Sequence, residues 1–213
     1  MKYFFKKSLG QHFLTNRSIL KKIASERDIK NKIIFEIGPG QGALTKEILL
    51  RKPKKLVLIE KDNNLRSYLL QLQEKFNNII SFIEEDILKI NLKDFNYNKI
   101  QIISNLPYNV ASTLIIKLIM DFDIIESMVL MVQKEVAERL SAKVSTSYYS
   151  RLSVLIQLHA EVEKMFDVAP CNFKPKPKVE STVIKIIPYS KRKIHYGKLD
   201  NILKISFSQR RKT

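Results

Sequence analysis

The sequence contains no tryptophan, a single cysteine and no apolar run long enough to span a membrane. The lone cysteine, Cys171, has no partner for an internal disulfide, which is typical of a protein kept in a reducing compartment. A membrane helix needs roughly 20 apolar residues, and residues 1–7 lack the apolar stretch of a secretory signal. We therefore expect a cytoplasmic protein with no membrane partner. Its 213 residues suffice for one large domain and the start of a second.

Acidic residues are scarce at both ends of the chain, and the net charge of +17 comes entirely from there. Residues 1–32 contain nine Lys and Arg against two Asp and Glu, and residues 174–213 contain twelve against two. The 141 residues between them contain seventeen of each. Two basic flanks around a neutral body indicate surfaces for a polyanion such as nucleic acid. Solubilising charge, a basic tail or contact with an acidic membrane surface are the alternatives.

Short apolar runs alternate with helical patterns over the central part of the sequence. The predicted strands are residues 33–37, 56–59, 79–83, 100–104 and 127–132, and the predicted helices are 44–50, 65–76, 112–120 and 134–143. A further helix is predicted after Asn16, whose side chain can cap it. Continuously apolar strands that alternate with helices predict an α/β fold with a parallel sheet covered on both faces. Ligands of such sheets bind beyond the carboxyl ends of the strands.

Glycine is rare, yet three of the five glycines, Gly38, Gly40 and Gly42, follow the first predicted strand. Glycines keep such a turn tight and let a ligand approach the backbone beside a helix N-terminus. Glu60 follows the second strand and can accept hydrogen bonds from ribose hydroxyls. This pattern predicts a nucleoside cofactor without deciding which one, and NAD remains open. The alternative is a structural turn beside a surface glutamate.

Acidic residues also follow the third strand, at Glu84-Glu85-Asp86. An acceptor in this position, next to the cofactor turn, can receive the amino group of an adenine. Three acids at the end of a strand are most often only solvated. Asp86 is therefore a candidate cofactor ligand because of its neighbours along the edge of the sheet, not because of its residue type.

The fourth strand is followed by Asn105-Leu106-Pro107-Tyr108. The N6 amine of adenine is conjugated with its ring, and it attacks a methyl group only when acceptors hold its two N–H groups out of the ring plane. The side-chain carbonyl of Asn105 and the backbone carbonyl of Leu106 can supply both acceptors. Proline stiffens the loop, and Tyr108 offers a face for a base removed from its helix. An ordinary strand-to-helix turn is the alternative.

An aromatic residue, Phe173, precedes the proline-stiffened basic segment Lys174-Pro175-Lys176-Pro177-Lys178. A base held between Tyr108 and Phe173, with the lysines on phosphates, would follow the logic of single-strand recognition. Phe173 can equally fill a place in the core. The other two histidines besides His12, His159 and His195, lie in no pattern of metal ligands, and we expect packing and surface roles for them and no metal.

With these residues in place, the sequence resembles the ribosomal RNA adenine N6-dimethyltransferases from Lys7 to its end, and within that family the bacterial small-subunit enzymes. The matching segments are Ser8–Leu14, the glycine turn Glu36–Thr45, Asn105–Asn109, Met131–Ala137, Phe173–Ser181 and Phe207–Thr213. The resemblance implies a Rossmann-like S-adenosylmethionine-dependent methyltransferase sheet. His12 is a departure, since asparagine is common at that position in the family.

The resemblance also implies roles for single residues. S-adenosylmethionine would lie over Gly38 and Gly40, with its ribose on Glu60, its adenine near Asp86, and His12 and Leu14 closing over it. The catalytic set would be Asn105, Leu106, Pro107, Tyr108 and Phe173, with Asn105 also bordering the cofactor. No general base is needed, because the sulfonium methyl group is already activated.

The implied substrate is a pair of adjacent adenines in the 3′-terminal hairpin loop of small-subunit (16S) rRNA in an assembling ribosomal subunit. We expect a monomer with a catalytic domain over residues 1–188, whose basic segment 1–30 closes over the cofactor. Residues 189–213 would begin a helical RNA-binding domain, which in this sequence is cut short. Two alternatives remain: a large-subunit (23S) rRNA methyltransferase that confers macrolide resistance, and a non-catalytic RNA-binding assembly factor.

Overall fold

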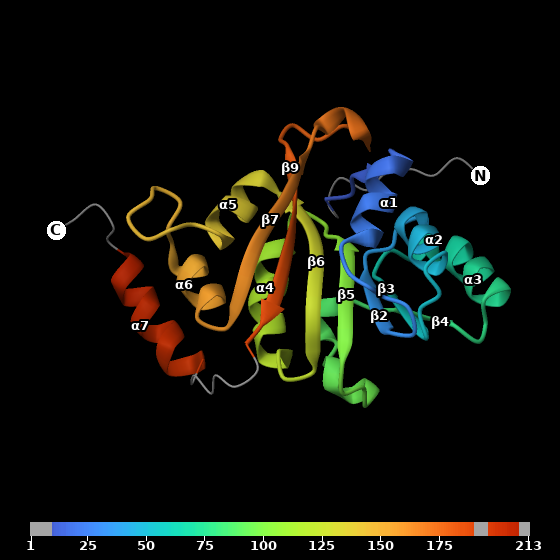
Figure 1. Cartoon of the computed structure of the whole chain (residues 1–213), viewed down its shortest axis with the longest axis horizontal. Helices are drawn as coiled ribbons and strands as arrows, with labels where there is room; N and C mark the ends of the chain where they lie inside the picture. The colour runs from blue at the N-terminus through green and yellow to red at the C-terminus, as the bar shows by residue number, and fades with distance from the viewer. Residues whose placement is uncertain (1–9, 190–195, 209–213) are drawn as a thin grey trace.

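A seven-stranded sheet forms the centre of the computed structural model, which describes residues 10–189 and 196–208. The strand order is β4-β3-β2-β5-β6-β9-β7 (Figure 1). In chain order these strands are β2 (Ile33–Ile37), β3 (Lys55–Glu60), β4 (Ile80–Glu84), β5 (Ile100–Asn105), β6 (Ile125–Gln133), β7 (Ala160–Val168) and β9 (Ser181–Pro188). The first five pair in parallel, which confirms the sequence prediction.

The last two strands of the sheet were not predicted. β9 runs antiparallel to both of its neighbours, β6 and β7, so the sheet is mixed and not wholly parallel. Strand β7 lies at the edge of the sheet and carries Glu161, Glu163 and Lys164 among its apolar residues. These charged residues interrupt the apolar run by which the parallel strands are recognised.

Seven α-helices accompany the sheet in the part of the chain that the structure describes. They are α1 (Arg17–Ser25), α2 (Ala43–Leu49), α3 (Arg66–Lys75), α4 (Ala111–Leu118), α5 (Lys134–Leu140), α6 (Arg151–Gln157) and α7 (Tyr196–Ser208). The Asn16 side chain accepts the backbone N–H groups of Ser18 and Ile19, which confirms the predicted cap of α1. None of the described helices is both long and apolar enough to cross a bilayer.

The two faces of the sheet build two separate apolar clusters. In β3, Leu56 and Leu58 belong to the cluster that also takes in residues of α1, α2 and α3. Val57 and Ile59 of the same strand belong to the cluster formed with α4, α5 and α6. Successive side chains of a strand point to opposite faces, so this alternation places helices on both sides of the sheet. The α/β, Rossmann-like prediction is confirmed.

The order in which strands are added to the sheet reverses between β2 and β5. From β2 the next strands, β3 and β4, are added on one side, whereas β5 and β6 are added on the other. The backbone pairing of β2 with β5 reaches only Phe35 and Ile102. Beyond it, the buried Ser104 hydroxyl donates to the Ile37 carbonyl. At such a switch point the loops diverge and leave a crevice above the sheet.

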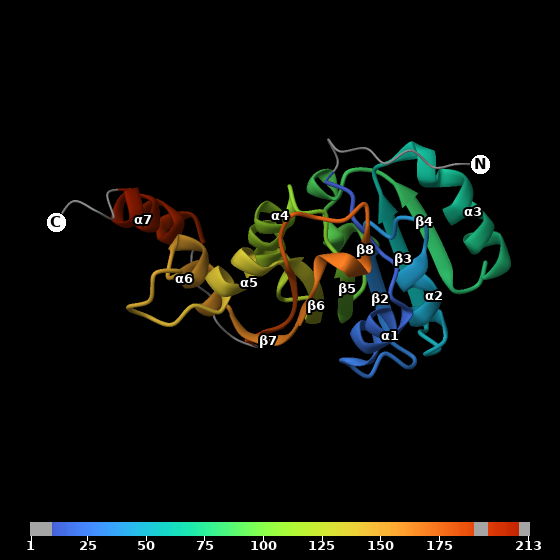
Figure 2. The same ribbon diagram turned by 90° about the horizontal axis from the view of Figure 1, so that it is seen from above.

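The helix α7 falls within the predicted C-terminal segment 189–213. Its Leu203 is buried in the same cluster as α4, α5 and α6, and α7 lies at the end of the molecule opposite α3 (Figure 2). The division into two domains at residue 188 stays a prediction. Residues 1–9, 190–195 and 209–213, which include His195 and part of both basic flanks, lie outside the described residues.

A carboxyl group is buried at the centre of the fold. Glu36, in the central strand β2, is 1% exposed, and its Oε2 accepts a hydrogen bond of 2.7 Å from the Thr45 hydroxyl. Burial removes the carboxylate from water and raises the pKa of Glu36 from 4.5 to about 8, although the Thr45 hydrogen bond opposes this shift. At neutral pH the folded protein therefore holds a proton on Glu36 that the unfolded chain has lost.

Replacing Glu36 with Gln should flatten the pH dependence of stability. Because the pKa of Glu36 is raised on folding, its contribution is complete below pH 4.5 and is lost as the pH rises towards 8. The loss should approach about 1.4 kcal/mol per pH unit. Glutamine keeps an acceptor for Thr45 and has no proton to lose. Urea unfolding measures the free energy of unfolding of both proteins between about pH 5 and pH 8. The value for the variant should rise relative to that of the wild type as the pH rises. The same pH dependence in both proteins would contradict the assignment.

Candidate active site

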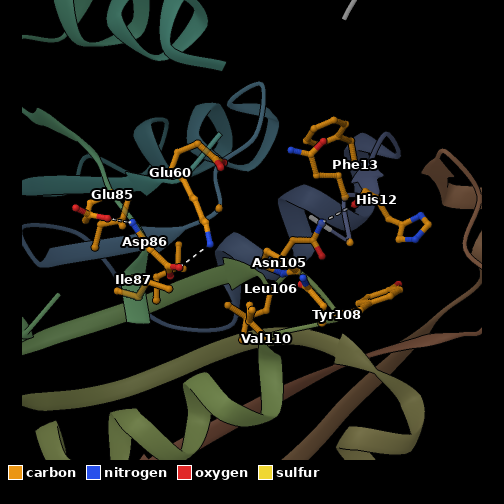
Figure 3. A pocket seen from close by; sticks show the side chains of 18 residues that line it. His12, Phe13, Glu60, Glu85, Asp86, Ile87, Asn105, Leu106, Tyr108 and Val110 are labelled. Carbon is orange, nitrogen blue, oxygen red and sulfur yellow. Dashed lines mark hydrogen bonds and ion pairs between the residues drawn. The ribbon is translucent and has the colours of Figure 1, made fainter. Parts of the chain in front are cut away.

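A pocket lies above the carboxyl ends of β2, β3, β4 and β5, at the switch point of the sheet. It is lined by Gly10, Gln11, His12, Phe13, Ile37, Gly38, Ile59, Glu60, Lys61, Glu85, Asp86, Ile87, Asn105, Leu106, Pro107, Tyr108, Asn109 and Val110. Figure 3 shows Glu60, Glu85 and Asp86 on one side of this pocket and His12, Asn105 and Tyr108 on the other. The pocket thus has an acidic half and an amide and aromatic half.

The glycine turn between β2 and α2 forms part of the wall and depends on left-handed backbone geometry. Gly38 and Gly40 have φ angles of 66° and 59°, which cost a residue with a Cβ about 1–2 kcal/mol. A Cβ on Gly40 would also lie 2.4 Å from the ring of Phe13, whereas one on Gly38 would lie 3.4 Å from Pro107. The turn therefore brings bare backbone up to the pocket and to the N-terminal segment.

Glu60, the last residue of β3, is held by the backbone on both sides. Its two carboxylate oxygens accept hydrogen bonds from the N–H groups of Asp62 at 2.9 Å and Gly40 at 3.3 Å. The side chain is 8% exposed, and burial raises its pKa. Each carboxylate oxygen has a second lone pair, so Glu60 can still accept hydroxyl groups from a ligand in the pocket.

Asp86 follows β4 and caps a short 3₁₀ helix (Ile87–Lys89) with its Oδ1, which accepts the N–H of Leu88 at 3.0 Å. Its Oδ2 accepts a hydrogen bond of 2.7 Å from the Lys61 ammonium group, whose side chain is 59% exposed. This hydrogen bond holds the pKa of Asp86 below its usual value. Asp86 is thus an ionised acceptor at the edge of the acidic half.

Asn105 is the last residue of β5 and lies in the amide and aromatic half of the pocket. Its Nδ2 donates a hydrogen bond of 3.1 Å to the backbone carbonyl of His12 (Figure 3). A carbonyl oxygen can only accept, so the NH₂ group and not the Oδ1 must face His12. The Oδ1 of Asn105 therefore points away from His12 and offers an acceptor. The N–H of the buried Leu106 is bound to the Met131 carbonyl at 3.1 Å, which fixes the backbone of the next residue.

Residues 10–16, which we call the N-terminal strap, cross the pocket from one half to the other. Gln11 donates to the buried carboxylate of Asp62 at 2.7 Å on the acidic side. Strand β1 (Phe13–Leu14) pairs with β8 (Phe173–Lys174) on the other side. The Thr15 N–H and hydroxyl both donate to the Asn172 carbonyl, at 2.8 and 2.9 Å. The strap is therefore anchored at both ends, and its middle forms a wall of the pocket.

The ring of Tyr108 is held on two sides. Its hydroxyl lies 2.5 Å from the Ser181 hydroxyl, and its ring stacks with that of His12, at 5.2 Å between centroids and 30° between planes. Burial raises the pKa of Tyr108, so the phenol stays protonated at neutral pH. Tyr108 is thus an oriented aromatic surface and not a base.

Most of the residues predicted from the sequence meet in this pocket. His12, Gly38, Glu60, Asp86, Asn105, Leu106, Pro107 and Tyr108 all line it. Leu14 and Phe173 do not: they are 3% and 5% exposed and pack in the cluster of α1, α2 and α3, and Gly40 lies behind Phe13. Within the described residues, no three histidine, cysteine or carboxylate side chains gather as a metal site would require.

The chain matches the family described as ribosomal RNA adenine dimethylase over residues 3–213. It is 43% identical to the ribosomal RNA small subunit methyltransferase A of Pelagibacter ubique, over 97% of this chain and 80% of that protein. A methyltransferase of the same name from a Sulfurihydrogenibium species is 44% identical over 97% of this chain and 81% of its own. The chain belongs to the ribosomal RNA adenine dimethylase family. Its enzyme class, an rRNA adenine dimethyltransferase, is the one predicted.

Two solved structures of methyltransferases superpose on this chain. A dimethyladenosine transferase from Plasmodium falciparum superposes with a TM-score of 0.83 at 37% identity, over 95% of this chain and 73% of that one. The 23S rRNA methyltransferase ErmE superposes with a TM-score of 0.76 at 22% identity, over 93% of this chain and 80% of its own, and shares the fold.

Several residues that line the pocket were not predicted from the sequence, among them Gln11, Phe13, Lys61 and Asn109. Phe13 could have been predicted from the sequence, because it neighbours Leu14 in an extended segment. Successive side chains of such a segment point to opposite sides, so only one of the two can face the pocket. The prediction chose Leu14, which the structure buries in the core. Gln11 binds Asp62, and Lys61 binds Asp86. These partners are distant in the sequence, so no local pattern predicts the contacts.

The clash between Gly40 and Phe13 predicts unequal effects of two alanine substitutions. Gly38→Ala should lower the free energy of unfolding by about 1–2 kcal/mol, the cost of a left-handed alanine. Gly40→Ala should lower it further, because its Cβ meets the Phe13 ring. In a Phe13→Ala background, Gly40→Ala should lower the free energy of unfolding by no more than Gly38→Ala does. Urea unfolding of the four variants measures this. A larger loss for Gly40→Ala that persists without the Phe13 ring would contradict the packing.

Proposed function

We propose that this dimethyltransferase transfers methyl groups from S-adenosylmethionine to the N6 amines of two adjacent adenines in the 3′-terminal hairpin loop of 16S rRNA. The observation that carries the proposal is the orientation of Asn105, which turns its Oδ1 away from His12 and leaves it as an acceptor. We place the reaction in the cytoplasm, on an assembling small subunit, and propose that a single copy acts alone.

The acidic half of the pocket suits a nucleoside methyl donor. Glu60 would accept the ribose hydroxyls, since its carboxylate is oriented by Gly40 and Asp62 and borders the pocket. Asp86 would accept the adenine amino group, sharing its Oδ2 with Lys61 or displacing that exposed ammonium group. The turn at Gly38 supports close approach of a ligand to the backbone, because Gly38 lines the pocket and has no side chain. The donor supplies an activated sulfonium methyl group when bound.

The other half of the pocket suits a target adenine. The Asn105 Oδ1 and the Leu106 carbonyl would accept the two N–H groups of the amine and draw its nitrogen out of conjugation. Tyr108 would stack on the ring of a base removed from the RNA. Phe173 is buried in the apolar cluster of α1, α2 and α3 and would anchor the start of the basic segment that follows it. Catalysis then rests on orientation, and the proton leaves the methylated amine to solvent.

The basic segment after Phe173 adjoins the target half of the pocket. Lys174, Lys176 and Lys178 are exposed, and Pro175 between them accepts a hydrogen bond of 2.7 Å from the His12 ring. Lysines in this position would bind the phosphates of the RNA loop from which the base is taken. The relatives that are 43–44% identical carry the small-subunit name, and they favour 16S over 23S rRNA.

Asn105→Ala should abolish methyl transfer and leave donor binding intact. The substitution removes the oriented amide oxygen, and loss of one such group typically lowers kcat by about 100-fold or more. Donor affinity, measured by calorimetry, should change by less than about twofold, because the Glu60 and Asp86 contacts remain. Transfer is measured on unmethylated small subunits with labelled donor, and undiminished turnover of the variant would rule out this role of Asn105.

The same assay separates the proposed function from its alternatives. The wild-type protein should methylate small subunits and not protein-free large-subunit RNA. Transfer to the large-subunit RNA alone would identify the macrolide-resistance activity, and donor-independent binding without transfer would identify an assembly factor.

Binding to the subunit should weaken steeply with added salt. Each lysine that neutralises a phosphate of single-stranded RNA contributes about 0.7 to the slope of log affinity against log salt. Replacing Lys174, Lys176 and Lys178 together with Gln should therefore reduce the slope by about 2. The matched control replaces three exposed lysines next to the opposite, amino-terminal ends of the strands, Lys54, Lys75 and Lys99. Equal slopes for the two triple variants would contradict the placement of the RNA.

A further inference from the structure

The turn that follows β4 carries Asp86 and Ile87, two residues that line the pocket. Figure 3 shows both of them on the acidic side of the pocket. The turn is a single 3₁₀ helix, Ile87–Lys89. Its internal hydrogen bonds run from the Leu88 N–H to the Asp86 Oδ1, at 3.0 Å, and from the N–H groups of Lys89 and Ile90 to the carbonyls three residues before them, at 2.8 and 3.2 Å. So short a helix is marginal in water on its own, so contacts from outside must hold it.

Lys117, in the last turn of α4, supplies such a contact. Its ammonium group donates a hydrogen bond of 2.6 Å to the Ile87 carbonyl and a second hydrogen bond to the Ile90 carbonyl. The 3₁₀ helix is therefore capped at its start by Asp86 and at its end by Lys117. Burial lowers the pKa of Lys117, and the carboxylates of Asp121 and Asp86 oppose this shift. Lys117 is thus a tether of the turn and not a solvated surface lysine.

Lys117 and Asp86 bind the two ends of one peptide group. The Ile87 carbonyl, which accepts from Lys117, and the Leu88 N–H, which donates to the Asp86 Oδ1, belong to the same peptide unit. A peptide unit is planar and rigid, so a lysine that fixes its carbonyl also fixes the direction of its N–H. That N–H in turn orients the Asp86 carboxylate.

The other contacts of the turn cannot replace this one. The Ile87 side chain packs in the cluster of α4, α5 and α6, but apolar packing has no direction and leaves a peptide group free to tilt. The Asp86 Oδ2 is bound by Lys61, whose side chain is 59% exposed. The half-buried Lys117 is therefore the contact from outside the turn that sets its orientation.

We propose that Lys117 is a positioning residue for the methyl donor: by holding the peptide between Ile87 and Leu88, it orients the Asp86 carboxylate that would accept the adenine amino group. This inference rests on the proposed function and deepens it. Lys117 is not among the residues that line the pocket, so it acts through Asp86 and without touching the donor.

Calorimetry with S-adenosylmethionine and the full chain tests the proposal. Lys117→Met keeps the length of the side chain and removes its donors, and donor affinity should fall about tenfold, as for the loss of one charge-assisted hydrogen bond. Lys117→Arg still donates to both carbonyls and should recover most of the affinity. The matched control is Lys89→Met in the same turn, which loses only an exposed ion pair with Glu85 and should bind within about twofold of the wild type.

A double-mutant cycle separates positioning from general loosening of the fold. In an Asp86→Ala background, Lys117→Met should weaken donor binding by less than about twofold further, because the group that it orients is gone. Losses that add up in the double variant would show that Lys117 does not act through Asp86. An equal loss in Lys89→Met, or no rescue by Lys117→Arg, would also overturn the proposal.

Steady-state kinetics on unmethylated small subunits give the second test. Lys117→Met should raise the KM for the donor about tenfold, while kcat at saturating donor and the KM for subunits stay within about twofold of the wild type. The helix that carries Lys117 follows the loop of Asn105 and Tyr108. A fall in kcat with unchanged donor affinity would therefore mean that Lys117 acts on the target side, which would overturn the proposal.

A third measurement uses the free protein and needs neither donor nor RNA. In proton–nitrogen spectra, exchange of the Leu88 backbone amide with water should be about tenfold faster in Lys117→Met, because local opening of the turn is easier without the tether, and unchanged in Lys89→Met. An unchanged rate in Lys117→Met would show that Lys117 does not hold the turn. If the wild type failed to bind S-adenosylmethionine, the proposed function would fall, while this measurement would still decide whether Lys117 holds the turn of Asp86.

Discussion

A carbonyl oxygen accepts hydrogen bonds and cannot donate them, and this constraint orients the amide on which the proposed reaction depends. The His12 carbonyl takes the NH₂ group of Asn105, so the amide oxygen is left on the other side. Without this partner the amide could rotate and present its NH₂ group, whereas the two N–H groups of an amine need acceptors. A single hydrogen bond from the Asn105 side chain to the His12 backbone, 93 residues away in the sequence, thus orients Asn105 as an acceptor.

The sheet topology brings those two segments together. Because β3 and β5 flank β2 on opposite sides, the loops after these strands open away from each other and leave room for a ligand. In the proposed function, the donor side is built from the end of β3 and the residues that follow β4, and the acceptor side from the end of β5 and the residues that follow it. The N-terminal strap closes over both, held by Asp62 at one end and by Asn172 at the other.

Much of this could be predicted from the sequence, because the parallel strands and the glycine turn have local signals. The five parallel strands are mainly apolar runs, and their predicted ends differ from the observed ones by two residues at most. Gly38, Glu60, Asp86 and Asn105 were found because each lies at or just beyond the carboxyl end of a strand. The antiparallel part of the sheet, β7 and β9, was missed because charged residues interrupt β7 and because β9 follows a loop rather than a helix. The contacts of His12 with Tyr108 and Pro175 were not predicted, because they are set by the fold and not by its neighbours in the chain.

The central claim is that the pocket pairs a methyl donor with an amine held by Asn105. A crystal structure with S-adenosylhomocysteine tests it most directly. The structure predicts the ribose on Glu60, the adenine at Asp86, and the sulfur facing the Asn105 Oδ1. A nitrogen atom should then fit about 3 Å from that oxygen and in line with the methyl position, at about 3–3.5 Å. A ligand seated elsewhere, or an Asn105 amide with its NH₂ group turned towards the sulfur, would contradict the claim.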